Sequence, residues 1–327
     1  MSERVFVTGA AGFIGGHTCA ALLRSGLDVV GVDNFDLFYD RRIKERTIQE
    51  LSLNPAFTFH EADIRDGAAM RGFTVGADVV IHLAARAGVR PSIADPALYT
   101  SVNVDGTVQL LEACVGNGVA RFVFGSSSSV YGDDTPVPFV ETVPAMCPIS
   151  PYAATKRAAE LICDVYRRLY DVRVASLRLF TVYGPRQRPD LAIHRFTKLL
   201  ALGSPIQRYG DGSSERDYTH IDDILKGILA AVEWTRAGGS EYEIFNLGES
   251  CTVWLDYLIE LIAGALGTTP EIESLPPQAG DVRRTFADIS KARKVLGYDP
   301  SVTIEDGILD FVDWFRTANE DKSTSLA

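Results

Sequence analysis

A tyrosine and a lysine, Tyr152 and Lys156, stand four residues apart directly after Pro151. Proline suits the first turn of a helix, and side chains at positions i and i+4 share one helix face. An ammonium group beside a phenol favours the phenolate, so such a tyrosine loses its proton more easily. The pair is therefore predicted to act as a general base on an alcohol whose carbon gives up a hydride. Because this spacing also arises by chance, the surrounding motifs must decide.

Four consecutive serines, Ser126 to Ser129, follow the apolar segment Phe122–Gly125, which we expect to be a strand. Ligands of open α/β sheets bind at the carboxyl ends of the strands. A serine at this position can hold the reacting hydroxyl group against Tyr152. An ordinary polar turn at a strand end explains one serine well but explains four in a row poorly.

Three glycines, Gly9, Gly12 and Gly15, separate a predicted strand at Val5–Thr8 from a predicted helix at Phe13–Arg24. Glycines at these positions make a tight turn, let the backbone approach a pyrophosphate and let the helix pack closely on the strand. The positive end of the helix dipole then faces the phosphate charge. The motif predicts a dinucleotide site.

Two carboxylates follow the next two predicted strands. Asp33 ends the strand Val29–Val32, about 20 residues beyond the glycines, where a carboxylate binds the adenosine ribose hydroxyls. It also repels a 2'-phosphate, which favours NAD over NADP. Asp63 follows the strand Phe57–His60, and it either faces the adenine or caps a helix N-terminus.

Short apolar runs alternate with helical patterns along the first half of the chain, which predicts a parallel sheet covered on both faces. The predicted strands are Val5–Thr8, Val29–Val32, Phe57–His60, Val79–Leu83, Phe122–Gly125 and Val172–Leu179, and the helices are Phe13–Arg24, Tyr99–Val115 and Tyr152–Tyr170. A helix at Asp222–Trp234 and a strand at Tyr242–Leu247 are expected to rejoin this sheet. The final predicted helix is Ile304–Thr317.

The predicted division of the chain has two parts. Residues 1–180, with 222–250 returning to them, are expected to form a dinucleotide-binding domain. Residues 181–221 and 251–327 are expected to form a smaller mixed α/β lobe that binds the substrate.

Composition excludes several classes of partner. A formal net charge of -11 argues against nucleic acid or a membrane surface as a partner, and no apolar run is long enough to span a bilayer. The five cysteines are scattered without metal-ligand spacing, which indicates reduced thiols, no metal site and a cytoplasmic location. We expect His82 to be a hydrogen-bonded core residue, and His194 and His220 to be structural.

The ordered motifs resemble the extended short-chain dehydrogenase/reductase family, which contains nucleotide-sugar epimerases and dehydratases. The matching residues are Gly9, Gly12, Gly15, His82, Leu83, Ala84, Ala85, Ser126, Ser127, Tyr152, Lys156, Arg216, Asp217 and Tyr218. The resemblance covers nearly the whole chain. It implies an α/β fold with a Rossmann-type, doubly wound parallel sheet.

The resemblance also implies roles for individual residues. Ser127, Tyr152 and Lys156 would form the catalytic triad, Asn103 would lie near the cofactor, and Arg216 would clamp the UDP diphosphate. The residues expected to bind NAD are Gly9, Gly12, Phe13, Ile14, Gly15, Asp33, Asn34, Asp63, Ile64, Leu83, Ala84, Ala85, Asn103, Ser126, Tyr152 and Lys156.

The type of reaction is indicated by the serine run. Dehydratases of this family carry Asp and then Glu after the catalytic Ser or Thr, and this acid–base pair eliminates water across C5 and C6 of the sugar. This chain has Ser128 and Ser129 there, so it lacks the acid for that step. The expected reaction is inversion at C4 of a UDP-hexose, in which hydride leaves, the 4-keto sugar rotates and hydride returns to the other face.

The sugar is predicted from residues around Thr181 and Arg188, where the chain resembles UDP-glucuronate 4-epimerases. Oxidation of glucuronate at C4 gives a β-keto acid, which loses CO2 when its carboxylate turns perpendicular to the ketone. Hydroxyl donors and a guanidinium can prevent that rotation. The residues expected to bind the UDP-sugar are Arg90, Ser127, Ser128, Thr181, Arg188, Arg216, Gln278 and Asp281.

Three other functions remain open at this point. They are a 4-epimerase of UDP-glucose or UDP-N-acetylglucosamine, a UDP-glucuronate decarboxylase, and a non-catalytic NAD-binding sensor on the same fold. The resemblance also implies a homodimer, in which the helices Tyr99–Val115 and Tyr152–Tyr170 pair across a two-fold axis into a four-helix bundle. The alternative is that these helices are buried within one subunit.

Overall fold

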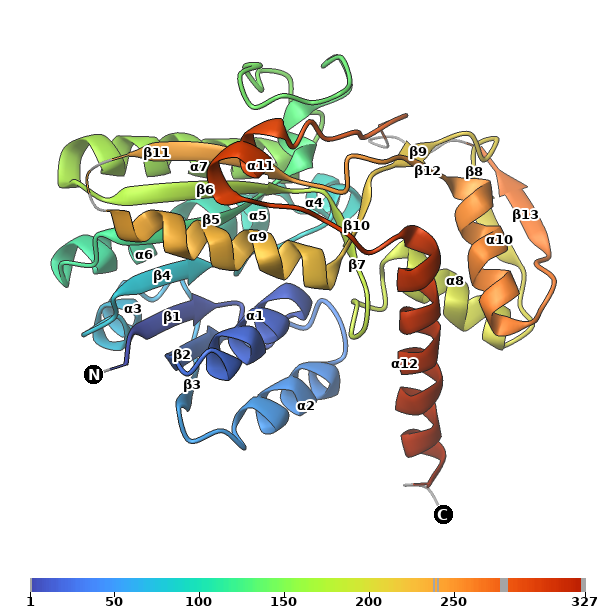
Figure 1. Cartoon of the computed structure of the whole chain (residues 1–327), viewed down its shortest axis with the longest axis horizontal. Coiled ribbons are helices and arrows are strands. Elements are labelled where there is room, and N and C mark those ends of the chain that lie inside the picture. The colour runs from blue at the N-terminus through green and yellow to red at the C-terminus, as the bar shows by residue number, and fades with distance from the viewer. Residues whose placement is uncertain (1, 238, 240, 277–281, 325–327) are drawn as a thin grey trace.

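A parallel sheet of seven strands forms the centre of the computed structural model, which describes residues 2–237, 239, 241–276 and 282–324 (Figure 1). Its order is β11-β6-β5-β4-β1-β2-β3. The strands are β1 (Arg4–Thr8), β2 (Asp28–Asp33), β3 (Phe57–Glu61), β4 (Val79–His82), β5 (Arg121–Ser127), β6 (Arg173–Leu179) and β11 (Tyr242–Leu247). Every residue of β4 and β6 is buried, because helices cover both faces of the sheet.

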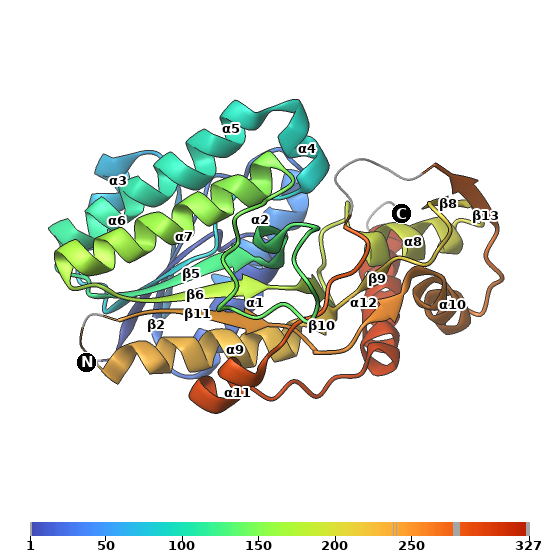
Figure 2. The ribbon, with the colours of Figure 1, turned by 90° about the horizontal axis from the view of Figure 1, so that it is seen from above.

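The helices form one layer on each face (Figure 2). One layer contains α3 (Gly67–Phe73), α6 (Gly106–Gly116) and α7 (Pro151–Tyr170), together with the short helices α4 (Val89–Ala94) and α5 (Pro96–Thr100). The other contains α1 (Phe13–Arg24), α2 (Arg41–Leu51), α9 (Ile221–Trp234) and α11 (Ser290–Leu296). This arrangement confirms the predicted Rossmann-type, doubly wound fold.

The two faces of the sheet have separate apolar cores. Along β1, Val5 and Val7 belong to the core beneath α1, whereas Phe6 belongs to the core beneath α6. This division follows from the alternation of side chains along a strand. Since all three side chains are fully buried, β1 is apolar throughout rather than alternating.

The helix predicted at Tyr99–Val115 is interrupted by a π turn at Ser101–Asp105, which lies between α5 and α6. The π turn contains Asn103, whose side chain is 2% exposed. Such insertions into helices frequently occur at functional sites. Here the π turn directs an amide side chain into the interior next to α7, which carries the predicted catalytic residues.

The remainder of the chain forms a lobe with its own core, at the right of Figure 1. Its strand pairs are β7 (Thr181–Tyr183) with β10 (Tyr218–His220), β8 (Ile206–Tyr209) with β13 (Ile272–Leu275), and β9 (Glu215–Arg216) with β12 (Val253–Trp254). Its helices are α8 (Ala192–Ala201), α10 (Leu255–Leu266) and α12 (Ile304–Thr324). The strand expected at Tyr242–Leu247 is β11, which pairs in parallel with β6. Within the described ranges, no helix is both long and apolar enough to cross a bilayer.

Asp217 connects the sheet to the lobe. Its buried carboxylate accepts hydrogen bonds from the backbone N–H groups of Glu249 at 2.8 Å, Ser250 at 3.1 Å and Ala287 at 3.0 Å. Burial raises the pKa of Asp217 to about 6 in spite of these donors. One carboxylate therefore fixes two segments distant in sequence beside Arg216, a predicted substrate residue.

Replacing Asp217 by Asn is expected to destabilise the fold by about 1–3 kcal/mol, because an amide nitrogen cannot accept one of these hydrogen bonds. Because the folded protein holds the Asp217 proton more tightly than the unfolded chain, its free energy of unfolding falls as pH rises from the ordinary pKa of 3.8 toward about 6. The difference in free energy of unfolding between the wild type and Asp217→Asn should therefore become smaller over that pH range. Urea unfolding at several pH values measures both effects, with the exposed Asp211→Asn as the control. An unchanged midpoint for Asp217→Asn would refute this role.

Candidate functional site

The glycine turn has the geometry that a dinucleotide pyrophosphate requires. Gly9 has φ +73°, and a Cβ there would lie 2.8 Å from Ala84 N, whereas a Cβ on Gly15 would lie 2.0 Å from Gly9 O. Neither position accepts a side chain. No side chain caps the N-terminus of α1 at Gly12, so the first-turn N–H groups are available to an anion. These features fit the pyrophosphate of NAD.

Asp33 lies at the carboxyl end of β2 and shapes the same turn. Its Oδ2 accepts a hydrogen bond from Ala11 N at 3.2 Å, and its Oδ1 accepts one from Phe35 N at 2.8 Å. Burial raises the pKa of this carboxyl group, while the charge of Lys44 lowers it. A carboxylate has about four lone-pair sites, so two remain for the ribose hydroxyls of a cofactor.

Asp63 does not cap a helix, because Asp66 is the residue whose carboxylate accepts from the first turn of α3. Asp63 instead accepts from Arg65 at 2.8 Å and from Asn34 Nδ2 at 3.0 Å. The hydrogen bond from Arg65 lowers the pKa of Asp63 to about 2. Ile64 is buried and lies where a Cβ on Gly106 would meet it at 2.7 Å. The adenine-facing position remains the expectation for Asp63.

The segment Leu83–Ala85 follows β4 and lies directly beside the glycine turn. Ala84 N donates to Thr8 Oγ1 at 3.2 Å, and a Cβ on Gly125 would meet Leu83 Cδ2 at 2.9 Å. His82, which ends β4, is 1% exposed and has Thr8 Oγ1 and Thr107 Oγ1 within 2.7 and 3.0 Å of its ring nitrogens. His82 is thus the hydrogen-bonded core residue that the sequence predicted.

Tyr152 and Lys156 lie on α7 as predicted, and Ser127 ends the adjacent strand β5. Ser127 hydrogen-bonds to the phenol of Tyr152. Ser127 Oγ also accepts from Ser129 N at 3.2 Å, which fixes the turn formed by Ser128–Tyr131. The structure therefore brings the three residues of the expected triad to one place.

The charges around Tyr152 differ from the sequence-based expectation. Burial raises the pKa of Tyr152, whereas the hydrogen bond with Ser127 and the charge of Arg188 lower it. Lys156 Nζ instead donates to Gly125 O at 2.7 Å, and burial lowers the pKa of Lys156 to about 8. The cation that favours the Tyr152 phenolate in this structure is Arg188, from the segment after β7.

A buried ion pair supports the triad, and the sequence analysis missed it. Glu160 and Arg178 are 0% and 1% exposed and form two hydrogen bonds of 2.9 Å. Burial acts to raise the pKa of Glu160, but the hydrogen bonds and charge of Arg178 lower it by more, so the pKa is below its ordinary value. Ser126 Oγ donates to Glu160 Oε1 at 2.6 Å, so this serine faces the pair. Glu160 follows Lys156 by four residues, and that spacing was the available signal.

Arg188 lies close to the triad and to the loop after β2. Its guanidinium binds Asp190 at 2.8 Å and lies 5.2 Å from the centre of the Phe38 ring. The pKa of Arg188 is raised, since its hydrogen bond and ion pair with Asp190 outweigh the opposing effect of burial. With 19% of its side chain exposed and an ion pair with Asp190, Arg188 is not a solvated surface charge.

Three of the remaining predicted substrate residues lie on the lobe or on α4. Arg90 on α4 lies 5.3 Å from the Tyr209 ring, and Arg216 on β9 donates to Glu215 O at 2.9 Å. Thr181 begins β7, where its N–H donates to Asp217 O at 3.1 Å. Ser128 begins the turn after Ser127. Gln278 and Asp281 lie outside the described residues.

Two other histidines have structural surroundings. His194 Nδ1 lies 2.7 Å from Gln187 O, and its ring packs against Phe311 on α12. His220 Nε2 lies 3.2 Å from Asp310, also on α12. Both side chains therefore hold lobe helices in place. In the part of the chain that the structure describes, no three His, Cys, Asp or Glu residues form a group that could hold a metal ion.

Comparison with known proteins agrees with this geometry. The model of the NAD dependent epimerase/dehydratase family matches residues 5–248. The UDP-glucuronate 4-epimerase of Thermodesulfobacterium geofontis is 41% identical over 95% of both chains. The crystal structure of UDP-glucuronic acid 4-epimerase from Bacillus cereus, in complex with UDP-glucuronic acid and NAD, superposes with a TM-score of 0.91 at 38% identity, covering 97% of this chain and 100% of that one.

A second solved structure is related at lower identity. The UDP-glucose 4-epimerase of Thermotoga maritima is 33% identical, with a TM-score of 0.87, and 97% of this chain and 100% of that chain are covered. The family model spans the glycine turn, the serine run and the Tyr152–Lys156 pair. The chain therefore belongs to the NAD-dependent epimerase/dehydratase family of extended short-chain dehydrogenases/reductases.

Proposed function

We propose that this protein is a UDP-glucuronate 4-epimerase, which converts UDP-glucuronate to UDP-galacturonate with NAD and without decarboxylation. The observation that carries the proposal is a guanidinium near the triad: Arg188 is 19% exposed, is held by Asp190 at 2.8 Å, and its charge lowers the pKa of Tyr152. A guanidinium so placed is suited to a sugar with a carboxylate next to its reacting carbon. The relatives named above as UDP-glucuronate 4-epimerases support the same substrate.

Proton transfer in this reaction belongs to Tyr152. Its phenolate accepts the proton of the sugar C4 hydroxyl, while Ser127 holds that hydroxyl by a hydrogen bond. Bound NAD supplies the hydride acceptor and donor next to this carbon. Lys156 lies one helical turn away and fixes the end of β5 through Gly125 O. After the 4-keto sugar has rotated, the hydride would return to the other face of C4, and Tyr152 would return its proton to the C4 oxygen.

A second group of residues protects the carboxylate of the 4-keto acid from loss as CO2. The 4-keto acid loses CO2 only when the carboxylate turns perpendicular to the ketone, so donors that hold it in another orientation protect it. Arg188 is one such donor, and its orientation is fixed by Asp190 at 2.8 Å. Ser127, Ser128 and Thr181 supply hydroxyl donors at the ends of β5 and the start of β7. Decarboxylation is therefore disfavoured by the residues present.

The other roles follow from the positions of the side chains. The glycine turn, Asp33 and the triad would hold the dinucleotide, and Arg90 on α4 and Arg216 in the lobe would hold the UDP group. The proposed division keeps an NAD-binding domain of residues 1–180 with 222–250 and a UDP-sugar lobe of 181–221 and 251–327, except that α11 packs on the sheet with α9 and β11. The expected location is the cytoplasm, with neither nucleic acid nor membrane as a partner.

The assembly that we propose is a homodimer through α7 and the neighbouring α6. Leu161, Val165 and Leu169 are spaced by four residues on α7 and are 53%, 48% and 65% exposed. They form an apolar stripe on the outer side of the helix layer, where Figure 2 shows α6 and α7 side by side. A second copy that presents the same stripe would bury it in a four-helix bundle.

The substrate is tested by offering UDP-glucuronate, UDP-glucose and UDP-N-acetylglucosamine separately and identifying the products by NMR. We expect UDP-galacturonate from UDP-glucuronate and no release of CO2. Tyr152→Phe should lose at least about 10²-fold in kcat and still bind NAD, because only the proton-transfer group is removed. Exclusive conversion of UDP-glucose would refute the glucuronate assignment. Full activity of Tyr152→Phe would refute the role of Tyr152.

Arg188→Met is expected to raise KM for UDP-glucuronate about 10- to 100-fold and to allow release of CO2, because the carboxylate loses a charged donor. The substitution also removes a positive charge near Tyr152 and raises the pKa of the phenol. The rising limb of the pH–rate profile should therefore move to higher pH. Binding of UDP-glucose, which lacks the carboxylate, is the control and should change little. Equal losses for both sugars would contradict the assignment.

Val165→Glu is expected to convert the dimer to a monomer, since it places a charge in the centre of the apolar stripe. Size-exclusion chromatography with light scattering measures the mass directly. Leu53→Glu is the control, because Leu53 is 85% exposed and lies after α2 on the other side of the sheet. A monomeric wild-type protein would exclude the bundle.

A further inference from the structure

Two loops at the carboxyl edge of the sheet are connected by an ion pair between Arg86 and Asp36. Asp36 follows β2 and Arg86 follows β4, and β1 lies between these two strands in the sheet. The glycine turn that follows β1 begins at Gly9. The ion pair therefore crosses from one side of the dinucleotide crevice to the other.

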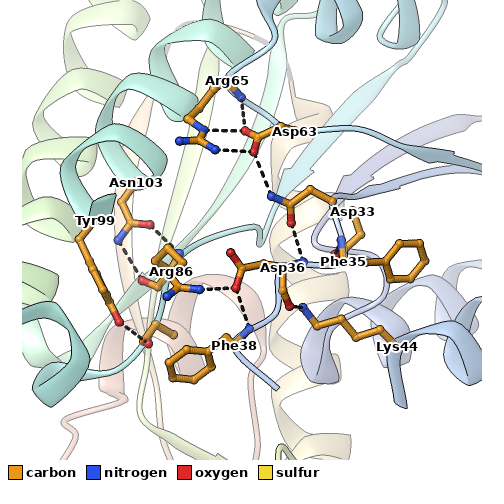
Figure 3. A network of polar contacts seen from close by, with 12 residues as sticks. Asp33, Phe35, Asp36, Phe38, Lys44, Asp63, Arg65, Arg86, Tyr99 and Asn103 are labelled. Carbon is orange, nitrogen blue, oxygen red and sulfur yellow. Dashed lines mark hydrogen bonds and ion pairs between the residues drawn. The ribbon is translucent and has the colours of Figure 1, made fainter. Parts of the chain in front are cut away.

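Asp36 is fixed by its own loop (Figure 3). Its Oδ1 accepts from Phe38 N at 2.9 Å, its N–H donates to Asn34 Oδ1 at 3.0 Å, and its carbonyl accepts from Lys44 Nζ at 2.7 Å. Lys44 is only 5% exposed although it carries a charge. These bonds hold the carboxylate in one orientation, toward the loop after β4.

Arg86 is fixed equally well. Asn103 in the π turn accepts from Arg86 N at 2.8 Å and donates to Arg86 O at 3.0 Å. The guanidinium lies 5.0 Å from the centre of the Phe38 ring and 5.9 Å from that of Tyr99. Its side chain is 18% exposed, and among the described residues its Nε has no hydrogen-bond partner. The Arg86 guanidinium is therefore held in place, and its Nε–H donor is unused among the described residues.

These contacts belong to a continuous network of hydrogen bonds and ion pairs that spans the whole crevice. At the adenine end, Asp63 binds Asn34, which binds the Asp36 backbone. At the other end, Asn103 binds the Arg86 backbone and Thr155 Oγ1, the latter at 3.0 Å. Thr155 lies on α7 between the two catalytic residues. Within the described residues of this network, the two loops are joined by a pair of opposite charges only between Arg86 and Asp36.

We propose that Arg86, Asp36 and Phe38 form a latch that closes over the NAD pyrophosphate and slows release of the cofactor between turnovers. The ion pair joins the loops, and the centre of the Phe38 ring lies 5.0 Å from the guanidinium of Arg86 and 5.2 Å from that of Arg188. In an epimerase the hydride returns to the same sugar, so the cofactor has no need to leave. The latch requires only the NAD site of the family, and its test involves no UDP-sugar, so its failure is distinguishable from failure of the proposed function.

The test measures exchange of bound NAD for isotope-labelled NAD in the purified holoenzyme. The variants are Arg86→Gln, Asp36→Asn and the double variant. Asn at position 36 keeps the acceptor for Phe38 N, so the loop turn is preserved. We expect each single variant to release NAD about three- to tenfold faster, and the double variant to release it no faster than the single ones, because both changes break one interaction. Arg236→Gln, which breaks an ion pair with Glu3 elsewhere on the protein, should leave the rate unchanged.

Each other outcome overturns the latch. Faster release for Arg86→Gln with an unchanged rate for Asp36→Asn would mean that Arg86 contacts the cofactor by itself. Additive effects in the double variant would mean that the two residues act independently. Unchanged rates in all variants would mean that other contacts retain NAD. Thermal unfolding of each holoenzyme, compared with Arg236→Gln, separates faster release from general loss of structure.

Discussion

The parallel alignment of the central strands is the constraint on which the rest of the structure depends. Parallel strands bring all of their carboxyl ends to one edge of the sheet, so the loops after β1, β2, β4 and β5 lie side by side although they are far apart in sequence. The glycine turn, Asp33 and the serine run occupy these loops. The helix α7 then needs only to pass beside β5 to bring Tyr152 against Ser127.

Burial of charge distinguishes this edge from an ordinary loop surface. Lys156 of the triad and the Glu160–Arg178 pair beside it are buried, where an unpaired charge would be strongly destabilising. Each is compensated by hydrogen bonds, Lys156 by Gly125 O and Glu160 by Arg178 and Ser126. These contacts tie β5, β6 and α7 together and fix the orientation of the catalytic side chains. Buried hydrogen bonds and the Glu160–Arg178 ion pair thus make the site rigid.

The lobe has an apolar core of its own, and polar contacts join it to the sheet beside the apolar packing of Val182 and Ala287 in the core beneath α1. Its buried residues form a separate cluster, and Asp217 bridges to the segments at Glu249 and Ala287. Arg188 lies in the segment after β7, and its charge lowers the pKa of the Tyr152 phenol. In the proposed function this is also the charge that would meet the sugar carboxylate.

The sequence by itself determined the order of strands and helices, the glycine turn and the Tyr152–Lys156 face, because these depend on local periodicity and on spacing within one element. It did not predict the helices α2, α8 and α10, whose stability comes from packing against neighbours. Nor did it reveal the pairing of Glu160 with Arg178 and of Arg86 with Asp36, or the effect of the Arg188 charge on Tyr152. Each of these pairs joins two elements that only the folded sheet brings together, and burial, which decides the pKa of Lys156 and Tyr152, exists only in the tertiary structure.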